Sequence, residues 1–367
     1  ADYWIMYEAS QNMINKNFSF VNKLYFLTWG YQLFHVFYEA FVLGIFNDII
    51  ILKILNCIYS TVITIMVYLI TKKISSENAA RISSLLYSIT LYPLYLNSVL
   101  GNQQLALMLM LIGVYVLLFK QNNIKNLVIV GILIALSNLE RPEGIVYIVT
   151  IIVYFIFSNE KFKDVMKKSA IILLTYFFIV KGSSFILIKS GFNDIGFENK
   201  NPYWKFITGF SYETNGIYNL DDVYYTDINH LEDAKKEALN RIKNVKKWPK
   251  LFYEKTKIIW LYEGLEECFN AKNINISDEL KQMIFSYIKL MNLMIILFVI
   301  IGSYKNKLDN ESKFFMINVI IYFFIYLLIE VHIRYYFNPQ VSLFILSSIG
   351  IDKILKQIDK KEKLHNS

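Results

Sequence analysis

The chain has 367 residues, of which 55% are hydrophobic and 16% aromatic, and its formal net charge is +8. A soluble domain of this size does not carry so much apolar sequence, and the apolar residues gather in runs long enough to cross a bilayer. The basic residues follow the connectors between these runs instead of forming one patch, which argues against nucleic acid as a partner. Cys57 and Cys268 offer no disulfide framework. The composition therefore indicates an all-α polytopic membrane protein.

The N-terminal part predicts an outer loop followed by the first crossings. Because the sequence opens on Ala1 and Asp2 without an apolar lead, we expect a further helix upstream and Asp2 at the start of an outer loop (1–48). Residues 3–48 are aromatic and mixed, which is typical of interfacial helices. About nine crossings of roughly 20 residues follow, and the upstream helix would be a tenth. They are expected at about 49–71, 80–98, 104–119, 126–139, 143–158, 169–188, 283–301, 314–329 and 338–355.

Residues 189–282 form a long polar segment that is rich in aromatic residues, and we expect it to fold as a helical extracytoplasmic domain. Asn229 and Glu232 give a capping-box-like helix start, and Pro249 ends that helix or opens the next. The segment is either a roof over a site or a structural cap. The chain thus divides into an N-terminal membrane module (1–188), this cap segment (189–282), and C-terminal crossings with a basic tail (283–367).

The distribution of lysine between connectors predicts the orientation. Short cytoplasmic loops collect Lys and Arg, so the lysine-rich connectors are expected inside and the short connectors that hold only Arg141 or Arg334 outside. We therefore expect a protein of a bacterial-type plasma (inner) membrane with its active site on the extracytoplasmic face. The inner connectors carry Lys72, Lys73 and Arg81; Lys120 and Lys125; Lys161, Lys163, Lys167 and Lys168; Lys305, Lys307 and Lys313; and Lys353, Lys356, Lys360, Lys361 and Lys363.

Charged residues at the outer edge are candidates for chemistry. A carboxylate at Asp2 can accept the proton of an acceptor hydroxyl, or it is an ordinary surface residue. Pro142 turns the chain at Arg141, whose guanidinium either matches a lipid-linked phosphate or pairs with Glu140 or Glu143.

Arg334 also lies between two spans on the outer side, and two cations at one bilayer edge indicate an anionic lipid headgroup. Four scattered histidines, His332 among them, give no metal-ligand spacing. Lys181, within an apolar run, is expected to snorkel or to pair.

With these residues in place, the chain resembles the GT-C glycosyltransferases, in particular the bacterial, family 39-like branch related to protein O-mannosyltransferases and aminoarabinose transferases. The resemblance rests on Asp2, the stretch 29–31, the Arg141–Pro142 turn, the segment 204–222, and Arg334 followed by Tyr335. It implies that Asp2 is the catalytic base and that Arg334, and less directly Arg141 with Tyr335, bind the phosphate of a polyprenyl-phosphate sugar.

One departure from the family concerns a second acid in the outer turn near residues 98–104. Here the turn carries neutral amides, which hydrogen-bond a sugar but cannot act as a base. Asp2 then acts alone, or another acid is its partner. A divalent metal is not indicated and no cofactor is required. The accessory candidates are Glu8, Glu140, Glu330, Gln103 and Gln104.

The resulting hypothesis is a glycosyltransferase that moves a hexosyl or pentosyl unit, with inversion, from a polyprenyl-phosphate carrier to a hydroxyl of a cell-envelope glycan, lipid or protein. A lipid-linked polysaccharide polymerase or ligase is the alternative among enzymes. A lipid-handling transporter or flippase is the alternative outside them, and it predicts charged or discontinuous helices near mid-membrane.

Overall fold

The computed structural model describes residues 2–158, 160–261, 277–304 and 309–365. Cys268, Lys305 and Lys307 lie outside the described residues. Within the described residues the regular structure is helical, with one isolated antiparallel bridge between Trp29 and Asn199. The protein is an all-α polytopic membrane protein, as the composition indicates.

The outer loop expected at 3–48 folds into short helices. They pack around a small apolar cluster that includes Met6, Phe20, Phe26 and Leu33, and Leu187 from a distant helix joins this cluster. The elements are α1 (Asp2–Ile14), η1 (Ser19–Asn22), α2 (Leu24–Thr28), η2 (Gly30–Gln32) and α3 (Leu33–Ile45).

A bundle of longer helices follows. Side-chain caps start several of them: Asp48 accepts from Ile50 N at 2.9 Å, and Asn123 accepts from Asn126 N at 2.9 Å. α8 packs between α7 and α10, while α17 packs on α15, α16 and α5. The bundle consists of α4 (Ile49–Ile74), α5 (Glu77–Ile89), α6 (Leu91–Leu96), α7 (Gln103–Phe119), α8 (Ile124–Glu140), α9 (Gly144–Ile156), α10 (Phe162–Lys189), α15 (Asp278–Tyr304), α16 (Asn310–Leu328) and α17 (Phe337–His365).

Four described helices are long and apolar enough to cross a membrane: α4, α10, α15 (over Asp278–Ser303) and α16. α7 and α9 are shorter apolar helices, so the predicted count of nine crossings remains a prediction. The span expected at 80–98 differs in detail, because the chain breaks at Thr90 between α5 and α6. Pro93 explains the break, since its ring lacks an N–H and would clash with the carbonyl of Ile89 in a continuous helix.

The cap segment expected at 189–282 carries helices over its described part. Asp227 caps a short 3₁₀ turn by accepting from Asn229 N at 2.8 Å. The N-cap expected at Asn229 lies one residue later, at His230, and the helix begins at Leu231. Pro249 lies in the first turn of the next helix, which it opens. The elements are α11 (Trp204–Gly209), η3 (Leu220–Thr226), η4 (Ile228–His230), α12 (Leu231–Ile242), η5 (Val245–Lys247) and α13 (Trp248–Trp260).

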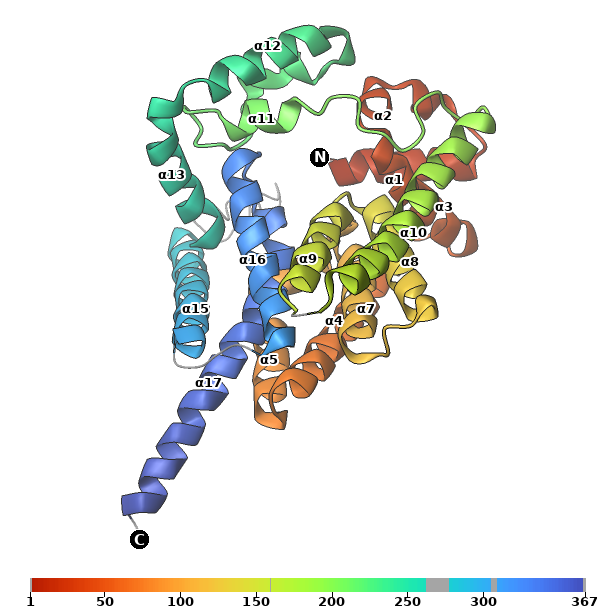
Figure 1. Ribbon diagram of the computed structural model, residues 1–367. Coiled ribbons are helices and arrows are strands. Elements are labelled where there is room, and N and C mark those ends of the chain that lie inside the picture. Colours follow the sequence, from red (N-terminus) through yellow and green to blue (C-terminus); the bar gives the residue numbers. More distant parts are fainter. Residues whose placement is uncertain (1, 159, 262–276, 305–308, 366–367) are drawn as a thin grey trace.

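The arrangement has two distinct ends (Figure 1). The N-terminal helices and α11–α12 gather at one end, and the C-terminal part of α17 extends away from the other. The 28 residues of α10 connect the two ends, a rise of about 42 Å at 1.5 Å per residue. Its last turns meet the N-terminal cluster through Leu187, so its first turns lie at the far end.

Candidate functional site

A cavity of about 650 Å³ lies where the N-terminal helices, the α6 region, the cap segment and the chain after α16 meet. Its wall combines charged groups with many aromatic rings, which suits a ligand with both polar and apolar surfaces. Of the residues expected at the site, it includes Asp2, Glu330 and Arg334. The lining is Asp2, Tyr3, Ile5, Tyr25, Trp29, Tyr31, Gln32, Tyr92, Tyr95, Leu96, Val99, Trp204, Lys205, Tyr218, Val223, Thr226, Glu330, His332 and Arg334.

The first charged pair in the cavity joins the start of the described chain to the turn between α16 and α17. Arg334 Nη1 lies 3.5 Å from Asp2 Oδ2, and 44% of the Asp2 side chain is exposed. His332 orients the arginine, because its Nδ1 accepts from the Arg334 backbone N–H at 3.1 Å and from Nε at 3.3 Å. The Tyr3 ring lies 5.3 Å from the guanidinium carbon. Asp2 therefore has an ionic partner and an open side.

The second charged pair is Lys205 from α11 with Glu330 from the turn after α16. The Tyr335 hydroxyl donates to Glu330 Oε2 at 2.9 Å and also contacts Lys205 Nζ. Burial would raise the pKa of Glu330, but the Lys205 ammonium brings it below its usual value. Burial would lower the pKa of Lys205, yet Glu330 raises it overall. Both groups are thus ionised, and Glu330 is committed to Lys205 and is not a free base.

Arg141 lies behind this pair and does not line the cavity. It forms an ion pair with Glu143, one of the two partners expected as the alternative to phosphate. Its Nη1 donates to Asn102 Oδ1 at 3.2 Å, and its guanidinium carbon lies 5.7 Å from the Tyr335 ring. Arg141 thus packs against the ring of Tyr335, whose hydroxyl binds Glu330.

Glu140 belongs to a buried cluster that ties α3 to the end of α8. His35 contacts Glu140 through Nδ1, and its Nε2 lies 3.3 Å from Glu39 Oε1. Burial would lower the pKa of His35, but the two carboxylates raise it to about 10. The imidazole is therefore a buried cation, and Glu140 is its counter-ion. This cluster could not be predicted, because a lone histidine on an apolar helix gives no spacing signal.

The other accessory candidates lie outside the cavity lining. Glu8 is exposed on α1. Gln103 donates to the Tyr3 hydroxyl, so it supports a lining residue. Gln104 Nε2 donates to Asn97 Oδ1 at 2.8 Å and to Pro93 O at 3.2 Å. Lys181 pairs with Glu198 at 3.0 Å, in line with the expected pairing.

Among the residues that the structure describes, no group of three or more His, Cys, Asp or Glu side chains is placed to hold a metal ion. Lys205 is the functional candidate that the sequence did not single out. It is one lysine in a long polar segment, and only the fold brings it to Glu330.

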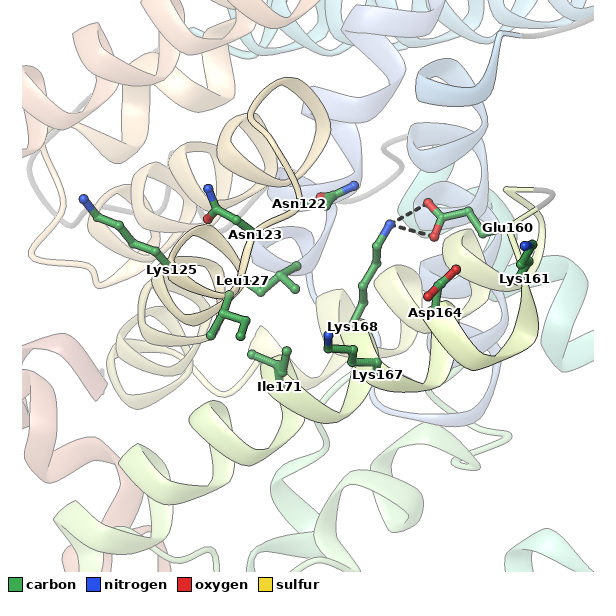
Figure 2. Close-up of a pocket in the computed structure, with 11 residues that line it drawn as sticks. Asn122, Asn123, Lys125, Leu127, Glu160, Lys161, Asp164, Lys167, Lys168 and Ile171 are labelled. Carbon is green, nitrogen blue, oxygen red and sulfur yellow. Dashed lines mark hydrogen bonds and ion pairs between the residues drawn. The ribbon is translucent and has the colours of Figure 1, made fainter.

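A second hollow, of about 920 Å³, lies at the start of α10 and is shown in Figure 2. It is larger, but none of the residues predicted for catalysis or donor binding line it. The Asp2 cavity is the better candidate for chemistry because a carboxylate, cations and phenols converge there.

Known proteins resemble the chain in sequence family and in fold. Residues 34–182 match the family model of dolichyl-phosphate-mannose-protein mannosyltransferase. No curated protein matches the chain. The archaeal oligosaccharyltransferase AglB from Archaeoglobus fulgidus, in complex with an inhibitory peptide and a dolichol-phosphate, is similar in structure, with a TM-score of 0.55 and 15% identity. The match covers 100% of this chain and 48% of that one.

An apo form of the Archaeoglobus fulgidus oligosaccharyltransferase gives a TM-score of 0.52 at 14% identity, covering 91% of this chain and 43% of that one. The chain thus spans about half the length of the solved structures that it matches. At this identity the likeness shows the fold. The family match and the fold together confirm the resemblance drawn from the sequence: they support the GT-C superfamily of membrane glycosyltransferases.

Proposed function

We propose that the Asp2 cavity transfers a sugar from a polyprenyl-phosphate carrier to a hydroxyl of a glycan, lipid or protein. The observation that carries the proposal is the Asp2–Arg334 pair, since it places a carboxylate and a guanidinium 3.5 Å apart in one cavity. Transfer from a lipid phosphate needs these two groups: a base for the acceptor and a cation for the departing phosphate.

The chemistry is a single displacement. The acceptor oxygen attacks the anomeric carbon as its proton passes to the Asp2 carboxylate, and the bond from that carbon to the phosphate oxygen breaks with its electron pair on the phosphate. Arg334 stabilises the phosphate by charge-assisted hydrogen bonds. Arrival of the phosphate gives Arg334 a new anionic partner, which leaves Asp2 available to the acceptor.

Lys205 adds a second cation to the phosphate side of the cavity. Its side chain is 34% exposed although it is paired with Glu330, and it lines the cavity. Tyr335 and, behind it, Arg141 hold the Lys205–Glu330 pair in place. In this proposal Arg334 contacts phosphate, while Arg141 acts through Tyr335 as a positioning residue.

The aromatic wall fits the remainder of the substrate. Rings such as Tyr25, Trp29 and Trp204 line the cavity and offer apolar faces to a sugar ring, while the phenols offer hydrogen bonds. The oligosaccharyltransferase with the similar fold was solved with a peptide and a dolichol-phosphate. A protein acceptor is therefore a specific form of this proposal, beside a glycan or lipid.

Donor binding tests the phosphate assignment. Arg334→Ala should weaken binding of a polyprenyl-phosphate sugar by roughly 10-fold or more, the effect expected for a lost hydrogen bond to a charged group. Arg334→Lys should keep part of the affinity, because it keeps the charge but not the planar fork. Lys200→Ala is the matched control, since Lys200 pairs with Glu198 outside the cavity. Equal donor binding by the wild type and Arg334→Ala would remove Arg334 from the site.

A further inference from the structure

The hollow at the start of α10 lies at the opposite end of the bundle from the Asp2 cavity. It is formed by the α7–α8 connector, the first turns of α8 and the first turns of α10. Since α10 rises about 42 Å from these turns to the N-terminal cluster, the hollow is a separate site from the Asp2 cavity. The lining residues are Asn122, Asn123, Ile124, Lys125, Leu127, Glu160, Lys161, Asp164, Lys167, Lys168 and Ile171.

The charge of this hollow is positive. Four lysines and two carboxylates line it, which leaves a net formal charge of +2. Lys168 is neutralised locally, because its Nζ lies 2.8 and 2.6 Å from the two carboxylate oxygens of Glu160 (Figure 2). Lys125 points away from this pair in the same view. Lys161 and Lys167 form no ion pair with any residue that the structure describes. The hollow thus offers two ammonium groups to an anion.

Apolar side chains accompany these lysines. Leu127 and Ile171 line the hollow itself, and Ile124 at its edge is 61% exposed. On the first turns of α10, Phe162 is 77% and Met166 54% exposed. Exposed apolar residues beside lysines at the end of a spanning helix are typical of the membrane interface, where chains contact lipid tails and ammonium groups contact headgroups.

We propose that this hollow binds the headgroup of an anionic membrane phospholipid. Lys161 and Lys167 contact the phosphodiester, while Ile124 and Ile171 in the lining contact the first part of the acyl chains. This gives the protein a lipid site at the end of the bundle away from the Asp2 cavity. The inference does not depend on the proposed transferase reaction.

Native mass spectrometry of the whole purified protein with phosphatidylglycerol and with phosphatidylcholine tests the proposal. The double variant Lys161→Gln/Lys167→Gln should weaken phosphatidylglycerol binding by about 10-fold or more, given that each lysine near a membrane surface adds to anionic-lipid binding. The matched control is Lys73→Gln/Lys360→Gln, which removes two exposed lysines elsewhere and should change binding less than about 2-fold. Phosphatidylcholine binding should be the same in all three proteins.

Three results would overturn the proposal. If the two double variants lost phosphatidylglycerol binding equally, the lysines would act only through the net charge of the protein. Equal affinity of the wild type for phosphatidylcholine and phosphatidylglycerol would remove the charge recognition. If inorganic phosphate displaced phosphatidylglycerol at a concentration equal to that of the lipid, the hollow would be a site for a free anion. A melting temperature unchanged by the substitutions, as expected for exposed side chains, separates these results from misfolding.

Discussion

Asp2 and Arg334 neutralise each other across the cavity, and each keeps a side open to it. The carboxylate is 44% and the guanidinium 25% exposed, so a ligand can reach both without unfolding the wall. A ligand phosphate competes with Asp2 for Arg334. In the proposed reaction the pair would link donor binding to the freeing of the base, and substitutions can test the two roles separately.

Asp2→Asn should separate catalysis from binding. The amide keeps the size of the side chain but cannot take the acceptor proton, so turnover should fall about 100-fold to 10,000-fold. Donor affinity should hold or rise, because the phosphate no longer competes with a carboxylate for Arg334. Glu8→Gln changes an exposed acid on the same helix, outside the cavity lining, and should leave turnover nearly unchanged. The measurement is transfer of a radiolabelled sugar from its lipid phosphate in detergent. Full activity of Asp2→Asn would show that another group is the base.

The His35 cluster gives a pH dependence of stability. The two flanking carboxylates raise the pKa of His35 from 6.5 to about 10, so the folded protein holds a proton that the unfolded chain releases above pH 6.5. This contribution is complete below about pH 6.5 and is lost as the pH rises through about 10. The melting temperature should fall over that window, and His35→Gln should flatten the fall.

His35→Gln should also lower stability at neutral pH, because it leaves two buried carboxylates without their cation; losing one partner of a buried pair costs about 3–5 kcal/mol. His230→Gln is the control, since half-buried His230, the N-cap of α12, stacks on Tyr224 and forms no ion pair with any described residue. A wild-type pH profile in His35→Gln would contradict the buried cation.

The site was predictable from the sequence in part. Asp2 and Arg334 stood out because charge at the outer bilayer edge is costly, and the fold brings them together from opposite ends of the chain. Lys205 and His35 carried no such signal. Their significance depends on partners 125 and 105 residues away, which periodicity and spacing do not reveal.

At the scale of elements, one buried lysine joins the cap segment to the bundle. Lys255 of α13 donates to Gly209 O at 2.9 Å, Leu327 O at 2.8 Å and Ile329 O at 2.7 Å. The first acceptor ends α11 and the other two end α16, where carbonyls without helical partners carry partial negative charge. Burial lowers the pKa of Lys255 to about 7, but the three carbonyl acceptors match the three protons of the charged form. One ammonium thus binds the ends of two helices.

Lys255→Met should therefore loosen the cap without unfolding the bundle. It leaves three buried carbonyls without a donor, and each such group costs about 1–3 kcal/mol when it is unpaired. Hydrogen exchange should accelerate in α11 and α13 and stay unchanged in α4. Lys250→Met, on the exposed side of the same helix, serves as the control. Unchanged exchange in α11 would mean that other contacts hold the cap.

The helices themselves follow from local rules, with two informative exceptions. α4, α10, α15 and α16 coincide with long apolar runs, which is the signal that length and hydropathy detect best. The break at Thr90 depends on Pro93, whose effect on the preceding turn a hydropathy window does not register. The start of α12 was predicted one residue too early, because Asp227 caps the 3₁₀ turn η4 and His230, which follows Asn229, is the N-cap of α12.

At the scale of the whole molecule, two sites of opposite character lie at opposite ends of the bundle. The Asp2 cavity has paired charges and aromatic walls, whereas the hollow at the start of α10 has an excess of lysine. The lysine excess of short inner loops would place the hollow at the cytoplasmic face and the cavity outside. A lipid-phosphate donor that is presented outside would then meet the cavity, and anionic inner-leaflet lipid the hollow.

Cysteine labelling tests this orientation, in a background where Cys57 and Cys268 are replaced by serine. Lys246→Cys lies on the exposed surface of the cap segment, and Gln121→Cys lies on the exposed α7–α8 connector. An impermeant maleimide should label Lys246→Cys in intact cells and Gln121→Cys only after the membrane is permeabilised, because the lysine distribution places them on opposite sides. If only Gln121→Cys were labelled in intact cells, the orientation of the protein in the membrane would be the opposite of the one predicted. The Asp2 cavity would then face the cytoplasm, and the proposed reaction would need a donor presented on that side.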